Sequence, residues 1–305
     1  HPTFLPAAQR LAALHQKNEG YTSAIATTDQ IYNEFSSGRQ DISAIRDFVR
    51  MIYKRNFSSG KPVKYVCLMG DGSYKNKIRS LLNNSNVIPT YQSHNSLSFT
   101  NSVATDDFFG LMSDDEGYDA EGYGTVDLGV GRLTCRSVTE INAVVTKIEN
   151  YYKKDDNFKI ADQAPENCNT NETTMSDWRN WLLFLADDKD WALHMRDANK
   201  LTNVVRNKSP LFNIDKVFLD AYQRLSTPGG KRYPDAEEDL KRRVKKGILI
   251  FNYTGHGGEV GLTEERMVNI PSINAFDNFN KLFLFITATC EFSRYDDPAR
   301  TSAGE

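Results

Sequence analysis

Residues 248–259 read ILIFNYTGHGGE and residues 282–293 read LFLFITATCEFS, and these two stretches decide the fold. Each begins with a run of apolar and β-branched residues, which favours a buried strand. Each run ends abruptly in polar or glycine residues, as strands of an open α/β sheet do where their carboxyl ends meet the loops. The two stretches therefore predict neighbouring core strands whose ends carry His256 and Cys290.

Segments with strand and helix character alternate along the rest of the chain, which is typical of a doubly wound α/β sheet flanked by helices. Strands are expected at residues 63–69, 87–91, 126–130, 181–186 and 214–219, and helices at about 45–52, 138–152, 191–205 and 236–245. The polar stretch from Lys153 to Asp177 marks a boundary. It divides the chain into an N-terminal α/β subdomain, residues 1–160, and a catalytic α/β subdomain, residues 175–305.

The composition excludes several classes of protein. The 37 basic and 40 acidic residues give a net charge of −3, which does not suit a phosphate backbone, so nucleic acid is not an expected partner. The longest apolar runs fall short of the roughly 20 residues that cross a bilayer. No basic and apolar leader opens the sequence, so we expect either that a targeting segment has been removed or that this is an internal fragment.

The four cysteines are too few for a disulfide scaffold, and none forms a C-x-x-C pair. Cys67 and Cys135 lie in or beside apolar strand-like runs, where a small buried thiol is expected. Cys168 lies in the polar stretch APENCNTNETT and is expected to be an exposed loop thiol. Cys290 differs, because it ends an apolar strand and begins a polar loop.

The pairing of His256 with Cys290 suggests nucleophilic catalysis. A thiol attacks a carbonyl as the thiolate, which an adjacent imidazole can generate before it protonates the leaving group. Gly255, Gly257 and Gly258 allow sharp turns and close approach of a ligand to the backbone. Exposed N–H groups in this glycine stretch and at Cys290 could form an oxyanion hole. Taken alone, the glycines around His256 are also consistent with a tight turn.

Other titratable residues are weaker candidates. His1, His15 and His94 have no obvious partner, so surface or local hydrogen-bonding roles are expected. His194 lies on a predicted helix after a strand-end acidic pair and remains a lesser site candidate. The acidic run Asp114–Glu116 could bind calcium, but no spacing resembles a defined calcium loop, so a solvated turn is favoured. No cofactor is required by these patterns.

The segment FNYTGHGGE followed by TATCEF resembles the gingipain-like branch of the caspase/gingipain clan of cysteine peptidases. The resemblance extends from about Cys67 to Glu305 through the motifs CLMGDGSY, ATDDFFG, DLGVGR, TPGGKRYPDA and TATCEFSRYDDPARTSAGE. Within this family, the motifs are similar to those of the cell-surface peptidases of the type IX secretion system.

The resemblance implies a caspase-like α/β fold in two subdomains, with a catalytic dyad of His256 and Cys290. It also implies oxyanion donors at Gly257 and Cys290. Gingipains carry an acidic residue just before a strand segment that ends in Gly-Arg, and the matching position here is Asp127 in VDLGVGR. Because this residue is Asp rather than Glu, its shorter side chain makes Asp127 the third-ranked catalytic candidate.

The same resemblance implies a surface sortase of the outer membrane. Such a peptidase removes the C-terminal sorting domain of secreted cargo proteins and helps to attach the cargo to lipopolysaccharide, together with other type IX secretion components. An acyl-enzyme suits this activity, because water or an amine can resolve a thioester. The resemblance also implies that family elements follow Glu305, which makes the catalytic subdomain truncated at its C-terminus.

Three alternatives stay open. A general secreted endopeptidase of the gingipain type would use the same dyad on unrelated proteins. A non-catalytic assembly component of the secretion machinery would leave the dyad unused. A metal-assisted hydrolase would use acidic clusters with His194 or His256, although no H-E-x-x-H spacing supports it.

Overall fold

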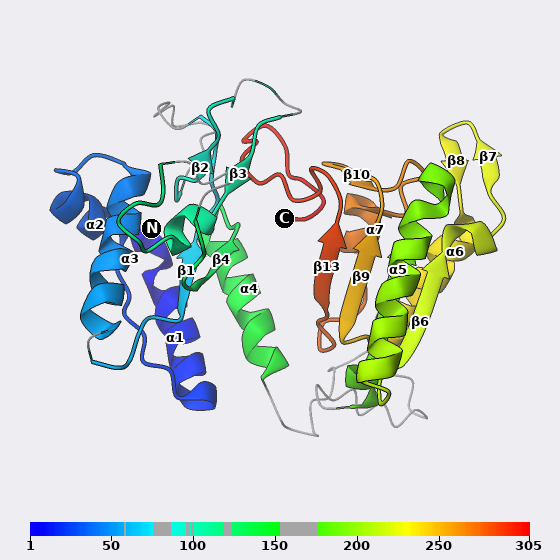
Figure 1. The fold of residues 1–305 in the computed structure, drawn as a ribbon, viewed down its shortest axis with the longest axis horizontal. Coiled ribbons are helices and arrows are strands. Elements are labelled where there is room, and N and C mark those ends of the chain that lie inside the picture. Colours follow the sequence, from blue (N-terminus) through cyan, green and yellow to red (C-terminus); the bar gives the residue numbers. More distant parts are fainter. Residues whose placement is uncertain (58, 76–86, 96–97, 99–100, 119–123, 153–175) are drawn as a thin grey trace. The chain divides into compact units, whose positions relative to one another are not determined.

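The computed structural model describes residues 1–57, 59–75, 87–95, 98, 101–118, 124–152 and 176–305 (Figure 1). The chain forms two compact units. The first contains residues 1–146, 294–301 and 305, and the second contains residues 147–293 and 302–304. The polar stretch predicted as the boundary lies, up to residue 175, outside the described residues. The segment after Cys290 therefore divides between the two units.

The first unit contains helices α1 (Leu5–Glu19), α2 (Thr28–Phe35) and α3 (Ile42–Phe57), and α4 (Val138–Tyr151) begins in it. Strand β1 (Tyr65–Met69) pairs in parallel with β4 (Gly129–Leu133), and β2 (Tyr91–Gln92) pairs antiparallel with β3 (Ala104–Thr105). The helix predicted at about residues 45–52 lies within α3. It packs against β1, because Ile45 and Leu68 share one buried cluster with the aromatic pair Phe108 and Phe109.

The prediction of a strand at residues 87–91 is wrong except at Tyr91, where β2 begins. The carbonyl oxygens of Ile88 and Pro89 accept hydrogen bonds from the guanidinium of Arg132, at 2.7 and 3.4 Å, rather than from a neighbouring strand. Proline also has no N–H to donate to a sheet ladder. The same guanidinium forms an ion pair with Asp106 at 2.7 Å, so it fastens this segment to β4.

The second unit is built on a parallel sheet with the strand order β13-β9-β5-β6 (Figure 1). Its strands are β5 (Trp181–Ala186), β6 (Asn213–Phe218), β9 (Ile250–Thr254) and β13 (Leu284–Ala288). Each overlaps a strand expected from an apolar run. The central parallel sheet with flanking helices confirms the predicted α/β class.

Helices α5 (Lys189–Lys208) and α6 (Pro234–Lys246) cover opposite faces of this sheet. Alternate residues of a strand point to opposite faces. Leu183 and Leu185 of β5 pack in one cluster with Leu240 of α6, whereas Ala186 packs with Ala198 of α5. The continuous apolar run of β5 is thus explained by burial on both faces.

Short elements complete the second unit. The loop expected at STPGGKRYP is a hairpin of β7 (Leu225–Thr227) and β8 (Gly230–Arg232). A three-stranded antiparallel sheet follows His256, made of β10 (Gly257–Gly258), β11 (Gly261–Leu262) and β12 (Val268–Asn269), and α7 (Ile270–Asn274) comes next. Within the described part of the chain, no helix has the length and apolar character that a bilayer crossing requires.

The strand order creates a switch point between β5 and β9. The chain leaves β5 for β6 on one side and later returns to β9 on the other side. The loops after the two strands at a switch point run in opposite directions and leave a crevice at the carboxyl ends of the strands. Open α/β folds bind ligands in this crevice. Asp187 and Gly255 are the first residues after β5 and β9, so this edge of the sheet is where a site is expected.

Candidate functional site

The carboxyl ends of β9 and β13 lie side by side. Their last paired residues are Thr254 and Ala288, and the N–H of Gly255 donates to the carbonyl oxygen of Ala288 at 3.3 Å. His256 and Cys290 each follow this pair by two positions (254 to 256 and 288 to 290). The predicted neighbouring strands are therefore confirmed.

The loop that carries His256 packs against the residue before Cys290. A Cβ atom on Gly257 would lie 2.3 Å from the Oγ1 atom of Thr289, so this position has no room for a larger residue. The carbonyl oxygen of His256 accepts hydrogen bonds from the Tyr253 hydroxyl at 2.5 Å and from the N–H of Thr263 at 2.9 Å. These contacts hold the backbone around His256 in place.

The side chain of His256 contacts two other titratable groups. Its Nε2 atom lies 2.8 Å from the Oδ2 atom of Asp190, and the Nε2 atom of His194 lies 3.3 Å from the same oxygen. The two imidazole rings are nearly perpendicular, with centroids 5.0 Å apart. If Nε2 of His256 donates to the carboxylate, as this hydrogen bond implies, Nδ1 is the nitrogen left to accept a proton.

The hydrogen bond from His256 lowers the pKa of Asp190, and His194 adds to this effect. Asp190 therefore stays ionised, and its carboxylate is placed to orient the imidazole of His256. All three side chains offer ligand atoms within 4.8 Å of one another.

Asp190 lies in an unusual stretch of backbone. Asp190, Trp191 and Ala192 have φ values of 54°, 56° and 60°, so three successive residues adopt the left-handed conformation within α5. This conformation disfavours each non-glycine residue by about 1–2 kcal/mol. Such strain gathers at functional sites, which supports a functional role for this turn. Sequence periodicity missed Asp190, although its position four residues before His194 was a usable signal.

A family model describes the whole chain. The model of peptidase family C25 matches residues 1–305. The chain belongs to peptidase family C25. This is the family of the gingipains, which are cysteine peptidases. No curated protein sequence matches the chain.

Two solved gingipain structures share the fold of this chain, and a third structure matches half of the chain. The Arg specific cysteine proteinase gingipain R (RgpB) has a TM-score of 0.63 and 15% identity, over 97% of this chain and 54% of that chain. The complex of the Porphyromonas gingivalis RgpB pro- and mature domains has a TM-score of 0.62 and 15% identity, over 96% and 54%. Dimeric latent PorU from Porphyromonas gingivalis is 30% identical over 50% of this chain and 15% of that chain, with a TM-score of 0.41. The C25 chain thus spans about half the length of the RgpB chains.

Asp127 lies in the first unit of the C25 chain, just before β4, whereas His256 and Cys290 lie in the second unit. Its Oδ2 atom accepts a hydrogen bond from the N–H of Met112 at 3.0 Å, and its own N–H donates to the carbonyl oxygen of Gly110 at 2.9 Å. Asp127 therefore has a local structural role, and its catalytic role stays a prediction.

The cysteines of the C25 chain differ in exposure. Cys135 is buried, as predicted, and Cys290 is exposed. The prediction of a buried Cys67 is wrong: Cys67 is exposed, because it lies on the face of β1 opposite to Leu68, and it is Leu68 that packs in the buried cluster with Ile45 of α3. Its surroundings still desolvate the thiol and raise its pKa. Cys168 lies outside the described residues.

The acidic run forms an exposed turn at Asp114 and Asp115, as predicted, and protein contacts hold it. Asp114 forms ion pairs with Arg50 and Lys54, and the Glu116 carboxylate accepts hydrogen bonds from the N–H groups of Ser113 and Thr125. The weaker histidines also make local contacts where the structure records them. His1 contacts Thr3 and His15 contacts Glu19.

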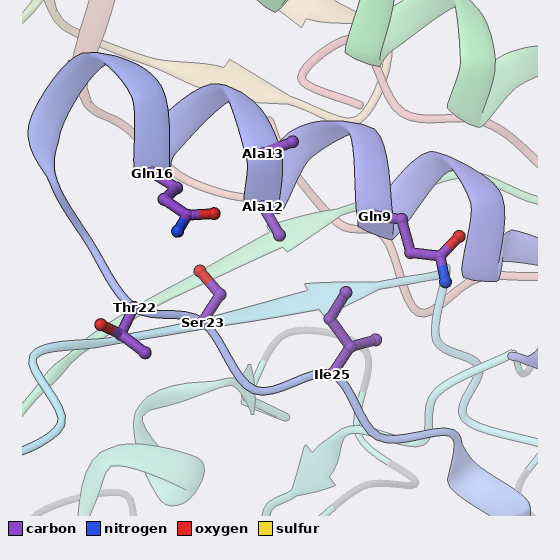
Figure 2. Close-up of a pocket in the computed structure, with 7 residues that line it drawn as sticks. All are labelled: Gln9, Ala12, Ala13, Gln16, Thr22, Ser23 and Ile25. Carbon is purple, nitrogen blue, oxygen red and sulfur yellow. The ribbon is translucent and has the colours of Figure 1, made fainter.

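Two surface pockets of the C25 chain lie in the first unit, and neither is lined by the strand ends that carry His256 and Cys290. Figure 2 shows one of about 250 Å³ between α1 and the segment after it, lined by Gln9, Ala12, Ala13, Gln16, Thr22, Ser23 and Ile25. It contains no titratable side chain. A wider hollow in the first unit is lined in part by Asp114, Asp115 and Asp127. We therefore place the candidate active site at the strand ends and not in either hollow.

The close packing around Gly255 gives a stability prediction. A Cβ atom there would lie 2.5 Å from both Asp187 Cβ and the Tyr253 hydroxyl oxygen, in a glycine with a φ of +155°. Gly255→Ala should lower the free energy of unfolding by about 2–4 kcal/mol. Gly258→Ala is the matched control, because its Cβ would meet nothing within 4 Å. Chemical denaturation of the two variants measures the difference, and equal losses would contradict the packing.

Proposed function

We propose that Cys290 is the nucleophile of a C25 cysteine peptidase and that His256 is its general base. The observation that carries this proposal is the parallel register of β9 and β13, which brings the residues beside His256 and Cys290 into contact. Transfer of the thiol proton to Nδ1 of His256 generates the thiolate. The thiolate attacks the scissile carbonyl, and the imidazolium then protonates the leaving amine.

The backbone N–H groups of Gly257 and Cys290 are the proposed oxyanion donors. Gly257 is the first residue of β10 and follows shortly after β9, and Cys290 follows shortly after β13, so both flank the same strand ends. Fixed N–H groups stabilise the negative charge that develops on the carbonyl oxygen as the thiolate attacks. Since Gly257 packs tightly against Thr289, its amide has little freedom to move away from Cys290.

For the substrate, we propose secreted cargo proteins that carry a C-terminal sorting domain. The peptidase would release this domain and transfer the cargo to an amine acceptor on lipopolysaccharide at the outer-membrane surface. The support comes from the sequence motifs between Cys67 and Glu305, which are similar to those of the surface peptidase PorU. Both products follow from one acyl-enzyme, because water hydrolyses the thioester and an amine forms a new amide bond.

An intact-mass measurement tests this substrate assignment. A purified cargo protein is incubated with the full-length enzyme, with and without an amine acceptor. We expect a single cleavage that removes the C-terminal domain, and a mass increase equal to the acceptor less water relative to the hydrolysed cargo. Cleavage at many sites in unrelated proteins would instead favour a general gingipain-type endopeptidase. An intact cargo under all conditions would favour an assembly component.

The carboxylate that orients His256 can be identified by comparing two variants. Asp190→Asn keeps the size of the side chain but removes the charge that contacts His256 at 2.8 Å. We expect it to lower kcat by about 10- to 1,000-fold without a matching loss of stability. Asp127→Asn should mainly weaken the acceptor of the Met112 N–H and lower the melting temperature. If only Asp127→Asn lowers kcat, Asp127 is the carboxylate that orients His256, and Asp190 has a structural role.

A further inference from the structure

Three acidic side chains meet at the carboxyl end of β5. Asp187 and Asp188 follow this strand directly, and Glu265 comes from the turn between β11 and β12. Each contributes a carboxylate oxygen, and these oxygens lie within 4.8 Å of one another. The exposed fraction of Asp187 and of Glu265 is 0%, and Asp188 is half-buried. Negative charge is therefore concentrated where little water reaches it.

The two aspartates are partly satisfied by protein donors. The Asp187 carboxylate accepts hydrogen bonds from the N–H groups of Lys189 at 3.1 Å and His256 at 3.3 Å. The Oδ2 atom of Asp188 accepts from the Tyr233 hydroxyl at 2.6 Å, whereas its Oδ1 atom is buried without a hydrogen-bond partner. One oxygen of Asp188 is thus left free to bind another group.

Glu265 is the least satisfied member of the cluster. Both of its carboxylate oxygens are buried, and neither accepts a hydrogen bond. The nearest cation, Arg224, has its Nη1 atom 3.8 Å from Oε1 and a side chain that is 41% exposed. Lys189 is close by, but its ammonium group pairs with Glu264 at 2.7 Å. A single arginine at this distance does not balance three carboxylates.

An ionised carboxylate that is buried without partners destabilises a fold by several kcal/mol. Glu265 has no hydrogen-bond partner among the described residues, and its carboxylate lies within 4.8 Å of ligand oxygens of Asp187 and Asp188. The cluster therefore needs either a proton or a cation. A proton neutralises only one of the three groups, whereas a divalent cation attracts all of them at once.

The donor atoms suit a hard cation. All of them are carboxylate oxygens, the type of ligand that Ca²⁺ and Mg²⁺ prefer. Ca²⁺ binds oxygen at about 2.3–2.6 Å, so two ligands of one ion can lie up to about 5 Å apart. The spread of the three oxygens, 4.8 Å at most, falls within this limit.

We propose that Asp187, Asp188 and Glu265 bind a divalent cation, with Ca²⁺ as the occupant. The ion joins the end of β5 to the turn between β11 and β12. Because Asp187 also holds the N–H of His256, the bound ion braces the loop of the candidate active site. The proposal concerns binding, and it holds or fails independently of peptidase activity.

The test is a comparison of melting temperatures with Ca²⁺ and with a chelator, using the full-length protein and its Glu265→Gln variant. A ligand at about 100 times its Kd should raise the melting temperature of the parent protein by about 5 °C. Glu265→Gln should reduce this shift to less than about 1 °C. In chelator, the variant should melt at or above the parent temperature, since it lacks the uncompensated charge.

Controls make the result specific to the cluster. Glu238→Gln removes the charge of an exposed carboxylate on α6 that is not part of the cluster, and it should leave the Ca²⁺ shift unchanged. Asp188→Asn is a second cluster variant, and calorimetric titration with Ca²⁺ should give it a Kd at least about tenfold weaker than that of the parent. An absent Ca²⁺ shift in the parent, a shift produced by Mg²⁺ alone, or an equal shift in Glu265→Gln would each overturn the proposal.

Discussion

Cys290→Ala should abolish cleavage by the full-length protein, with a loss of at least about 10³-fold, because no other group can replace the nucleophile. The exposed thiol lies at a polar strand end and not in a packed core, so the melting temperature should stay within a few degrees of the parent. Cleavage of a cargo protein and thermal unfolding, measured on the same preparation, separate the two effects.

The remaining cysteines are the controls for this prediction. Cys67→Ala, Cys135→Ala and Cys168→Ala should all retain cleavage. Of these, Cys135→Ala should cost the most stability, because its thiol is buried, within the usual range of about 0.5–3 kcal/mol. If a folded Cys290→Ala protein still releases the C-terminal domain from its cargo, Cys290 is not the nucleophile.

His256→Ala should lower kcat by about 10²–10⁴-fold, since both the formation of the thiolate and the protonation of the leaving amine use this imidazole. The loop should keep its shape, because the contacts that fix it involve the backbone of His256. His94→Ala is the control: it removes an exposed histidine outside the second unit and should leave kcat unchanged. A His256→Ala enzyme with parental kcat would exclude general base catalysis by this residue.

The sheet of the second unit was predictable from sequence because its strands carry continuous apolar runs, although Leu284 and Ile286 of the edge strand β13 are 60% and 45% exposed. Strands β5, β9 and β13 each coincide with such a run, and their parallel pairing brings the His256 and Cys290 loops to one edge. The helices expected at residues 191–205 and 236–245 are also present, as α5 and α6. These elements have strong local signals, and no distant contact was needed to recognise them.

The first unit was harder to predict. Helix α1 buries only Ala7 and Leu11, so its apolar stripe is weak, and α2 is eight residues long. The N-terminus of α2 does carry a signal in Thr27 and Gln30, which form a capping box. The exposure of Cys67 was missed because the apolar run around it suggested a strand covered on both faces.

The candidate site was predictable only in part. His256 and Cys290 follow strands, so their loops could be placed, but the partner of His256 depends on a left-handed turn at Asp190 that contradicts helical periodicity. The carboxylate cluster joins Asp187 and Asp188 to Glu265, which is 77 residues further along than Asp188 (265 − 188). No local pattern marks such a contact, because only the tertiary fold creates it.

The most direct test of the central claim is the rate at which iodoacetamide alkylates each cysteine of the full-length protein, measured by mass spectrometry of peptides near pH 6.5. Thiols react as thiolates, so a thiol that transfers its proton to an imidazole reacts fastest. The account predicts that Cys290 reacts at least about tenfold faster than Cys67, whose pKa desolvation raises, and that His256→Ala slows Cys290 at least about tenfold while leaving the rate of Cys67 unchanged. A Cys290 that reacts no faster than Cys67, or whose rate is the same in His256→Ala, would contradict it.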